Sequence, residues 1–135
     1  MKQALLAVLV LSCSSLLYAA TSGGNFAGVY KCTGRDPYLN KNYSGIVTIS
    51  PQNTVYQLDM RYDTGEVARG TGGLYNSELL SVVFQDTTDL NKVGLEQYRW
   101  SKDRKKMGGY WVYLGKDKLG TEVCEKQNSK QLSKN

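Results

Sequence analysis

The sequence predicts an all-β fold: an eight-stranded antiparallel barrel with up-and-down strand order, closed by a single disulfide. Three observations lead to this prediction. Short runs of β-forming residues recur roughly every ten to fifteen positions, and no stretch has the length and period of a substantial helix. In addition, the two cysteines beyond residue 20 lie in the first and the last of these runs.

Residues 1–20 resemble a secretory signal peptide and are set apart from the folded domain. Lys2 precedes an apolar run that ends in Ala19 and Ala20, small residues of the kind found before a cleavage site. The run is shorter than the roughly 20 apolar residues of a membrane span. We therefore expect cleavage after Ala20 and export to the periplasm or the medium. The alternative is a lipoprotein anchored through Cys13, whose preceding residues fit a lipidation motif poorly.

Local patterns then place eight strands along the chain. They are expected at residues 26–33, 43–50, 54–62, 67–74, 79–85, 93–101, 107–114 and 119–125. In the first, Tyr30 and Cys32 share one face. The second carries a β-branched run and ends at Pro51, which cannot donate a ladder hydrogen bond. The third alternates apolar and polar residues, as a half-buried strand does.

Short links between most strands favour antiparallel neighbours, and closure of eight strands into a barrel hides both sheet edges. Such a barrel is about the smallest whose interior can be filled by side chains or hold one small ligand. A disulfide between Cys32 and Cys124 fits the closure, because the first and eighth strands become neighbours only when the sheet meets itself. The barrel domain is expected over residues 21–126, with a flexible polar tail at 127–135. An open sandwich of two small sheets is the alternative.

The composition argues against catalysis. The chain has no histidine, which removes every mechanism that depends on a Ser/His or Cys/His pair or on a histidine-ligated metal. No phosphate loop, nucleophile elbow or short metal-binding cysteine spacing is present. We therefore expect a binding protein without a cofactor or metal. A nucleic-acid partner is not expected, because the chain contains no recognised docking module.

A set of short motifs is spread over nearly all of the chain beyond residue 20. They are Gly28-Val29-Tyr30, Asp36-Pro37, Tyr43-Ser44-Gly45, Tyr56, Gly70-Thr71-Gly72, Gly94 with Tyr98, Gly109-Tyr110-Trp111 and Gly120-Thr121-Glu122. Their order and spacing resemble a family of small exported bacterial proteins labelled fibronectin-binding. The resemblance implies a calycin-like or streptavidin-like β-barrel, a non-enzymatic role and adhesion to a host matrix protein such as fibronectin. The chain departs from the family pattern at Cys32, at Cys124 and in the basic stretch 99–106.

Basic residues are concentrated near the C-terminal end of the predicted barrel. Between positions 99 and 118, seven Lys and Arg residues accompany only two Asp residues. They fall in the two turns that flank the seventh strand, at opposite ends of an up-and-down barrel. Cations interleaved with aromatic rings suit an acidic protein or polymer, and the candidate binding residues are Arg99, Trp100, Lys102, Arg104, Lys105, Lys106 and Trp111. The alternative is a solvated Lys-rich turn that serves solubility.

Glu122 is the candidate polar group of the interior. It has the same strand parity as Cys124, so its carboxyl points inward if the disulfide does. A buried carboxylate requires a partner, for which Arg69, Arg99 or a tyrosine hydroxyl is available. Glu122 is then either the anchor of a ligand or a structural group that ties strand ends together.

Three function classes follow from these observations. The sequence favours a secreted or periplasmic binding protein that presents its loops to a macromolecular partner. The first alternative is a periplasmic lysozyme inhibitor, because those small exported barrels also have a Tyr-x-Cys in an early strand and a second cysteine near the C-terminus. The basic turn argues against it, since a basic lysozyme cleft would require acidic groups. The second alternative is a carrier that holds a small ligand inside the barrel.

Overall fold

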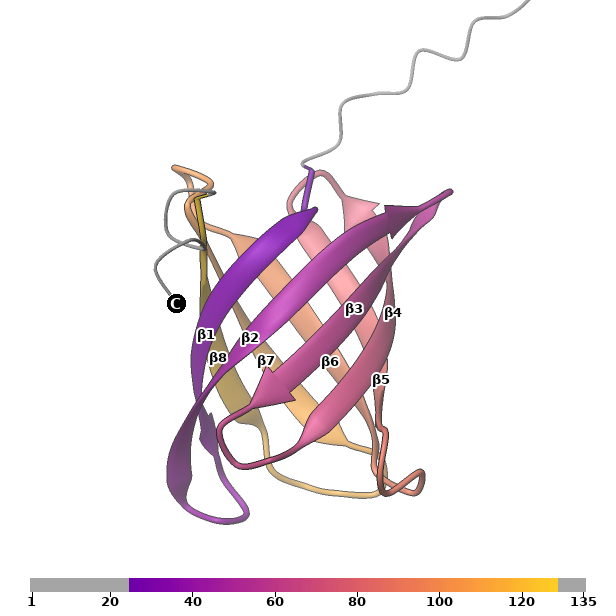
Figure 1. Cartoon of the computed structure of the whole chain (residues 1–135), viewed down its shortest axis with the longest axis vertical. Coiled ribbons are helices and arrows are strands. Elements are labelled where there is room, and N and C mark those ends of the chain that lie inside the picture. Colours follow the sequence, from indigo (N-terminus) through magenta and orange to yellow (C-terminus); the bar gives the residue numbers. More distant parts are fainter. Residues whose placement is uncertain (1–24, 129–135) are drawn as a thin grey trace, which may run out of the picture.

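Eight antiparallel strands close into a barrel in which neighbours in the sequence are neighbours in the sheet (Figure 1). The computed structural model describes residues 25–128, so the expected signal peptide, Cys13 and most of the expected polar tail lie outside the described residues. The strands are β1 (Gly28–Asp36), β2 (Lys41–Gln52), β3 (Val55–Tyr62), β4 (Val67–Asn76), β5 (Leu79–Asp86), β6 (Val93–Trp100), β7 (Lys106–Tyr113) and β8 (Gly120–Lys126). This confirms the predicted up-and-down barrel and excludes the sandwich.

The first connection is shorter than the sequence suggested. β1 and β2 pair as far as Asp36 and Lys41, which leaves a turn of residues 37–40 in place of the expected long loop. The Asp36 carboxylate accepts hydrogen bonds from the backbone N–H groups of Tyr38 (2.7 Å) and Leu39 (3.0 Å). Asn40 has φ 55°, a left-handed conformation that Asn tolerates well. Because these hydrogen bonds form a tight turn, β1 and β2 extend beyond the residues that were expected to form strands.

The barrel has two ends, named here as they stand in Figure 1. The lower end carries the turns at residues 37–40, 63–66, 87–92 and 114–119, and the upper end carries the turns between β2 and β3, β4 and β5, and β6 and β7. β1 begins and β8 finishes at the upper end. The described residues include no helix that is long and apolar enough to cross a membrane.

Aromatic side chains fill the upper half of the interior. Phe26 stacks on Trp100 with ring centroids 4.9 Å apart, and Trp100 lies 6.1 Å from the Tyr30 ring. The Tyr30 hydroxyl donates a hydrogen bond to the Phe26 carbonyl oxygen at 2.6 Å, which fixes Phe26 at the upper end just before β1. All three side chains are buried, so this end is plugged by apolar packing.

The predicted disulfide is present. Cys32 and Cys124 stand directly opposite each other in β1 and β8 and are covalently bonded across the seam where the sheet meets itself. Both side chains are fully buried and face inward. The bond therefore joins the first and last strands from inside the barrel.

Candidate functional site

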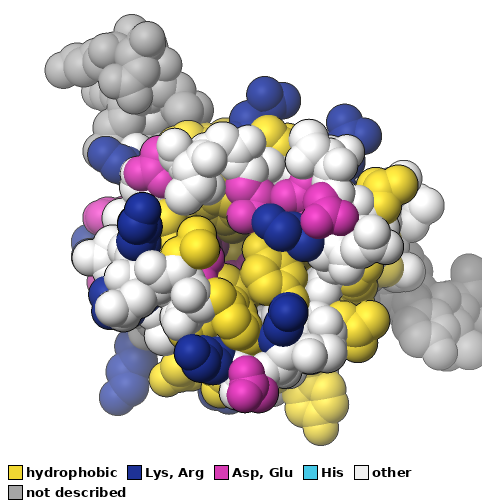
Figure 2. Space-filling view, turned by 90° about the horizontal axis from the view of Figure 1, so that it is seen from below, with side chains coloured by type: hydrophobic (Ala, Val, Ile, Leu, Met, Phe, Trp, Pro, Cys, Tyr) yellow, Lys and Arg dark blue, Asp and Glu magenta, His cyan; other side chains and the backbone are white. Residues whose placement is uncertain are grey.

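The lower half of the interior is not filled. It contains a cavity of about 100 Å³ whose walls include the rings of Tyr43, Tyr62, Phe84, Trp111 and Tyr113. Figure 2 looks into this end and shows hydrophobic side chains within the hollow, with acidic and basic side chains around it. The interior is thus divided into a packed upper half and an open, aromatic lower half.

The pairing of these rings with glycines explains how they line the wall. In four strand pairs, an inward aromatic residue stands directly opposite an inward glycine: Tyr43 with Gly34, Tyr62 with Gly45, Phe84 with Gly94, and Trp111 with Gly120. A Cβ built on any of the four glycines would overlap the opposing ring. Each ring therefore covers the backbone of the neighbouring strand, where a larger side chain would push it toward the barrel axis.

Hydrogen bonds fix the orientation of two of these rings. Trp111 Nε1 donates to the Tyr43 hydroxyl oxygen at 2.8 Å, and the Tyr43 hydroxyl donates to the carbonyl oxygen of Thr121 at 3.2 Å. At the mouth of the cavity, the Tyr113 hydroxyl donates to Glu66 Oε1 at 2.7 Å. These hydrogen bonds therefore hold the rings of Trp111, Tyr43 and Tyr113 in place in the wall of the cavity.

Three carboxyl side chains are buried. Asp86, at the end of β5, exposes 3% of its surface, and its Oδ1 accepts hydrogen bonds from the N–H and hydroxyl of Thr88 and from the N–H of Asp89. Glu96 and Glu122 expose 2% and 1% of their surface, and Glu96 lines the cavity.

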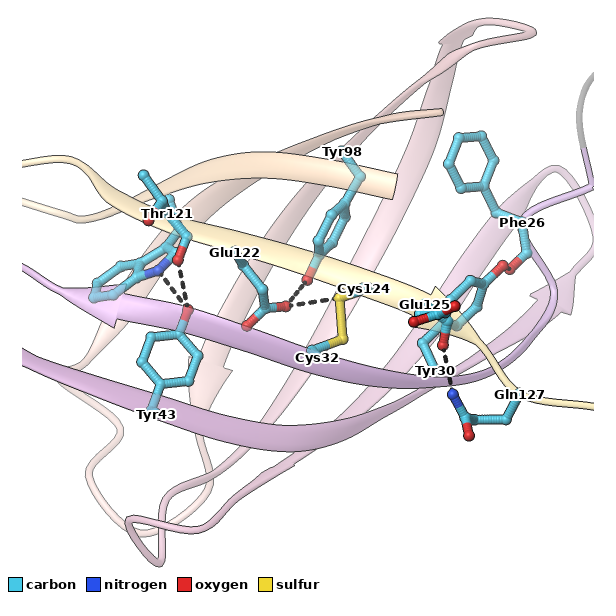
Figure 3. Close-up of a disulfide and its surroundings, with 11 residues drawn as sticks. Phe26, Tyr30, Cys32, Tyr43, Tyr98, Thr121, Glu122, Cys124, Glu125 and Gln127 are labelled. Carbon is cyan, nitrogen blue, oxygen red and sulfur yellow. Dashed lines mark hydrogen bonds between the residues drawn. A yellow bond between two sulfur atoms is a disulfide. The ribbon is translucent and has the colours of Figure 1, made fainter. Parts of the chain in front are cut away.

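Glu122 Oε1 accepts a hydrogen bond from the Tyr98 hydroxyl at 2.7 Å and lies 3.2 Å from Cys124 Sγ (Figure 3). Glu96 Oε1 and Glu122 Oε2 have no hydrogen-bond partner among the described residues. One oxygen of each carboxyl is thus left without a protein partner.

Burial favours the neutral form of both carboxyl groups. For Glu96, burial and then the negative charge of Glu122 raise the pKa well above its usual range, against a smaller effect of hydrogen bonding to Tyr98. For Glu122, burial raises the pKa, and hydrogen bonding to the Tyr98 hydroxyl offsets part of that effect. No Lys or Arg side chain is buried within residues 25–128, so no internal cation compensates either group.

The partner of Glu122 is a tyrosine rather than an arginine. Of the candidates from the sequence, Arg69 lies outside the barrel and pairs with Asp59 at 3.3 Å, and the Arg99 side chain is exposed. The predicted inward orientation of Glu122 is correct. Glu96 was missed by the sequence analysis, although it shares strand parity with Gly94, Tyr98 and Trp100, and this parity would have placed it inside.

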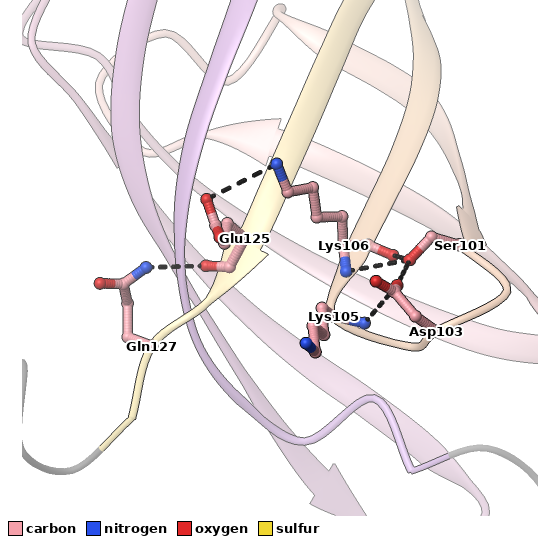
Figure 4. Close-up of polar contacts among 6 residues, drawn as sticks. All are labelled: Ser101, Asp103, Lys105, Lys106, Glu125 and Gln127. Atoms are coloured by element: carbon pink, nitrogen blue, oxygen red, sulfur yellow. Dashed lines mark hydrogen bonds and ion pairs between the residues drawn. The ribbon is translucent and has the colours of Figure 1, made fainter.

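The predicted basic turn lies at the upper end, away from the cavity. Arg99, Lys102, Arg104, Lys105 and Lys106 are exposed there. The Ser101 hydroxyl donates to Asp103 Oδ1 at 2.6 Å and accepts from the Lys106 backbone N–H at 3.1 Å, which shapes the turn (Figure 4). Within the described residues, the Lys106 side chain forms the one ion pair of these five cations, with Glu125 at 3.9 Å.

The two tryptophans predicted to accompany the basic turn are buried instead. Trp100 exposes 8% of its surface and belongs to the upper plug, while Trp111 exposes 7% and lines the lower cavity. Both have inward strand parity, which places their rings in the core and not on the surface that carries the lysines. The expected surface patch of interleaved cations and tryptophans is therefore corrected to a basic turn without them. Lys116 and Lys118 lie at the lower end, as the up-and-down order predicts.

Metal binding has a single geometric candidate among the described residues. The Cys32 and Cys124 sulfurs and a Glu122 oxygen lie within 4.8 Å of one another. Because the sulfurs are bonded to each other, they offer no thiolate ligands. This group is therefore a disulfide beside a carboxyl.

Comparison with known proteins identifies the architecture. No family model matches the sequence, and no curated protein is significantly similar to it. The chain is similar in structure to EF1p2_mFAP2b bound to DFHBI, with 12% identity and a TM-score of 0.60 over 75% of this chain and 93% of that one. It is also similar to a de novo designed fluorescence-activating β-barrel, with 12% identity and a TM-score of 0.58 over 78% and 97%. At this identity the likeness establishes the fold alone, and by fold the chain is a small closed β-barrel.

Proposed function

We propose that this protein is a non-enzymatic binding protein that holds a small molecule, with an aromatic or apolar part, in the lower cavity. The observation that carries the proposal is the division of the interior: the upper half is packed, whereas the lower half keeps a cavity with aromatic walls. Apolar pockets with a few convergent polar groups are the usual form of small-molecule sites. The disulfide suits an oxidising compartment, which supports the further proposal that the protein is exported.

The size of the cavity sets the size of the ligand. An apolar cavity of roughly 150 Å³ accommodates benzene, so the cavity volume of about 100 Å³ takes at most one aromatic ring, with the rest of the molecule in the mouth. The structural neighbour bound to DFHBI is a barrel of similar architecture in complex with a small molecule, which adds support. For the present chain, the size and the aromatic lining of the cavity define the ligand as a small molecule with one aromatic or apolar group.

Titration with benzyl alcohol, a small neutral aromatic probe, tests the proposal. The two indole N–H signals in a ¹H–¹⁵N spectrum report on the two halves, because Trp111 lines the cavity and Trp100 belongs to the plug. We expect saturable movement of the Trp111 signal with little change at Trp100, and loss of this response in Ala68→Leu, which fills the cavity. Thr71→Leu adds bulk to the outside of the same strand and should respond like the wild type. Equal movement of both signals would contradict the proposal.

A second candidate function uses the upper end. The exposed cations of the basic turn have few acidic neighbours, an arrangement suited to an acidic protein or polymer such as a host matrix component. This proposal is independent of the cavity. Its test is the charge-removal variant described in the Discussion.

A further inference from the structure

We propose that the ligand of the lower cavity is an organic cation, with a protonated amine that binds against the Glu96 carboxyl at the inner surface of the cavity. This inference rests on the proposed function and specifies the charge of the ligand. Its geometric basis is a buried carboxyl that lines the cavity and has one oxygen, Oε1, without a hydrogen-bond partner among the described residues.

The first step of the argument is the charge inside the barrel. A buried carboxylate requires a hydrogen-bond donor or a cation, and the buried residues within 25–128 include the carboxyls of Asp86, Glu96 and Glu122 but no basic side chain. Tyr98 donates a hydrogen bond to Glu122 Oε1, whereas Glu122 Oε2 and Glu96 Oε1 have no partner among the described residues. Of these two carboxyls, Glu96 is the one that lines the cavity. A protonated amine provides both the positive charge and up to three N–H donors.

The second step is the chemistry of the walls. Aromatic rings attract cations through their faces, and Trp is the most effective of them. Trp111 and Tyr113 flank the cavity with ring centroids 5.2 Å apart. A cation of the protein itself uses one of these rings, since Lys92 Nζ lies 6.0 Å from the Tyr113 centroid. The site therefore combines a carboxyl at its inner surface with rings suited to an ammonium group.

A metal ion fits this arrangement less well. Ca²⁺ takes six to eight oxygen ligands, and Mg²⁺ requires near-ideal octahedral coordination by oxygens. Three carboxyl residues line the cavity, but Asp36 accepts hydrogen bonds from the Tyr38 and Leu39 N–H groups and Glu66 accepts one from the Tyr113 hydroxyl. Most of the remaining lining is aromatic or aliphatic. The apolar part of an organic cation would pack against the aromatic walls, whereas a metal ion would make no favourable contact with them.

Binding of a cation also predicts a dependence on pH. Burial raises the pKa of the Glu96 carboxyl and so favours its neutral form in the free barrel, whereas a bound ammonium group would favour ionisation and the release of a proton. Affinity for the cation should therefore increase as the pH rises, by at most about tenfold per pH unit for one released proton. The other titratable or charged groups of the interior and the mouth are Glu122, Tyr43, Tyr62, Tyr98, Tyr113, Asp36, Asp86, Lys41, Glu66 and Lys92.

Three probes of similar shape separate the possibilities: benzylamine, benzyl alcohol and benzoate. In the wild type at pH 7, followed through the Trp111 indole signal, we expect benzylamine to bind about 10- to 100-fold more tightly than the alcohol, and benzoate to bind most weakly. In Glu96→Gln this preference should fall to within a few fold. Glu78→Gln, which removes an exposed acid at the upper end, should retain it.

The outcomes distinguish this inference from the proposed function. If the alcohol binds as tightly as the amine, or benzoate binds most tightly, the cavity is a binding site but the inference is overturned. If CaCl₂ alone saturates the same signal at micromolar concentration, the inference is also overturned, in favour of a metal. If none of the probes moves the Trp111 signal, both proposals fail. Should Glu96→Gln not fold, wild-type titrations at pH 6 and 8 decide: affinity for the amine should rise and affinity for the alcohol should stay constant.

Discussion

Glu96 shows how a single side chain can give the interior of a barrel its chemical character. Its neighbours along β6 on the inner face are Gly94 and Tyr98, so strand parity alone places its carboxyl inside. The inward orientation of Glu122 was predictable because Cys124, two residues later in β8, is expected to form an internal disulfide. β6 contains no cysteine that would identify its inward face. The absence of a hydrogen-bond partner for Oε1 could not be predicted, because it depends on how eight strands meet across the barrel.

The first prediction concerns Glu96→Gln and the pH dependence of stability. Burial raises the folded-state pKa above the unfolded value of about 4.3, so the folded state retains a proton that the unfolded state has lost as the pH rises above about 4. The free energy of unfolding should therefore fall with rising pH, by up to about 1.4 kcal/mol per pH unit for one retained proton, and less steeply in the variant. Urea unfolding at pH 5 and pH 8 measures this.

Glu78→Gln, an exposed acid at the upper end, is the matched control for that experiment and should keep the wild-type slope. Glu122 also has a raised pKa, so a reduced slope should remain in Glu96→Gln. Equal slopes in the wild type and Glu96→Gln would show that burial of this carboxyl does not govern the pH response.

The second prediction compares two glycines. A Cβ at Gly109 in β7 would overlap the backbone carbonyl oxygen of Gln97 in β6, and backbone cannot move aside cheaply. Gly109→Ala should therefore lower the free energy of unfolding by about 1–3 kcal/mol, the usual cost of overpacking. Gly73→Ala is the matched control: its Cβ would meet nothing within 4 Å, so its stability should change little or increase by a few tenths of a kcal/mol. Thermal unfolding of both variants gives the comparison, and similar losses would contradict it.

At the scale of elements, strands were predictable and their connections less so. The Asp63-Thr64-Gly65 run marks the end of β3, as expected. Pro51 does not end the second strand, as was expected from the sequence, because β2 continues through Pro51 to Gln52 and the chain turns at residues 53–54. The 37–40 turn is shorter than expected because Asp36 caps it from within β1. A side chain that bonds to the backbone two residues later tightens a turn in a way that hydrophobic alternation does not reveal.

The third prediction concerns the link between β1 and β8. The disulfide spans 92 residues, and the chain-entropy model assigns such a loop up to about 4–5 kcal/mol. The double variant Cys32→Ser/Cys124→Ser should therefore lose up to this amount of unfolding free energy in urea. Titration of a chain that begins at residue 21, denatured but not reduced, should find no free thiol. Two reactive thiols per such chain would contradict the disulfide.

At the scale of the whole molecule, the two ends differ in both packing and charge. The upper end is plugged by Phe26, Tyr30 and Trp100 and carries the exposed basic turn, while the lower end opens into the aromatic cavity. Up-and-down order allowed the sequence to assign the basic turns to opposite ends. The sequence did not reveal which half of the interior is hollow. The aromatic residues and the glycines that they cover lie on different strands, and only the register of those strands places each ring opposite its glycine.

The fourth prediction separates the two ends. Replacement of Lys102, Lys105 and Lys106 by Ser, together with Arg104→Asn because Arg104 has φ 56°, removes four exposed charges. Binding to an immobilised heparin-like polymer at low salt should weaken. The free energy of unfolding should change by no more than about 0.5 kcal/mol, and the response of the Trp111 signal to benzyl alcohol should be unchanged. Undiminished polymer binding would remove the basic turn as a binding surface.

The position of the chain ends has a practical consequence for the lower opening. β1 begins and β8 finishes at the upper end, so the described part of the chain starts and ends on the side away from the cavity. Attachment to a bead, a sensor chip or a fusion partner through either end would orient every molecule in the same way, with its mouth toward the solution. Immobilisation should therefore leave ligand uptake intact, whereas it would bring the basic turn close to the support.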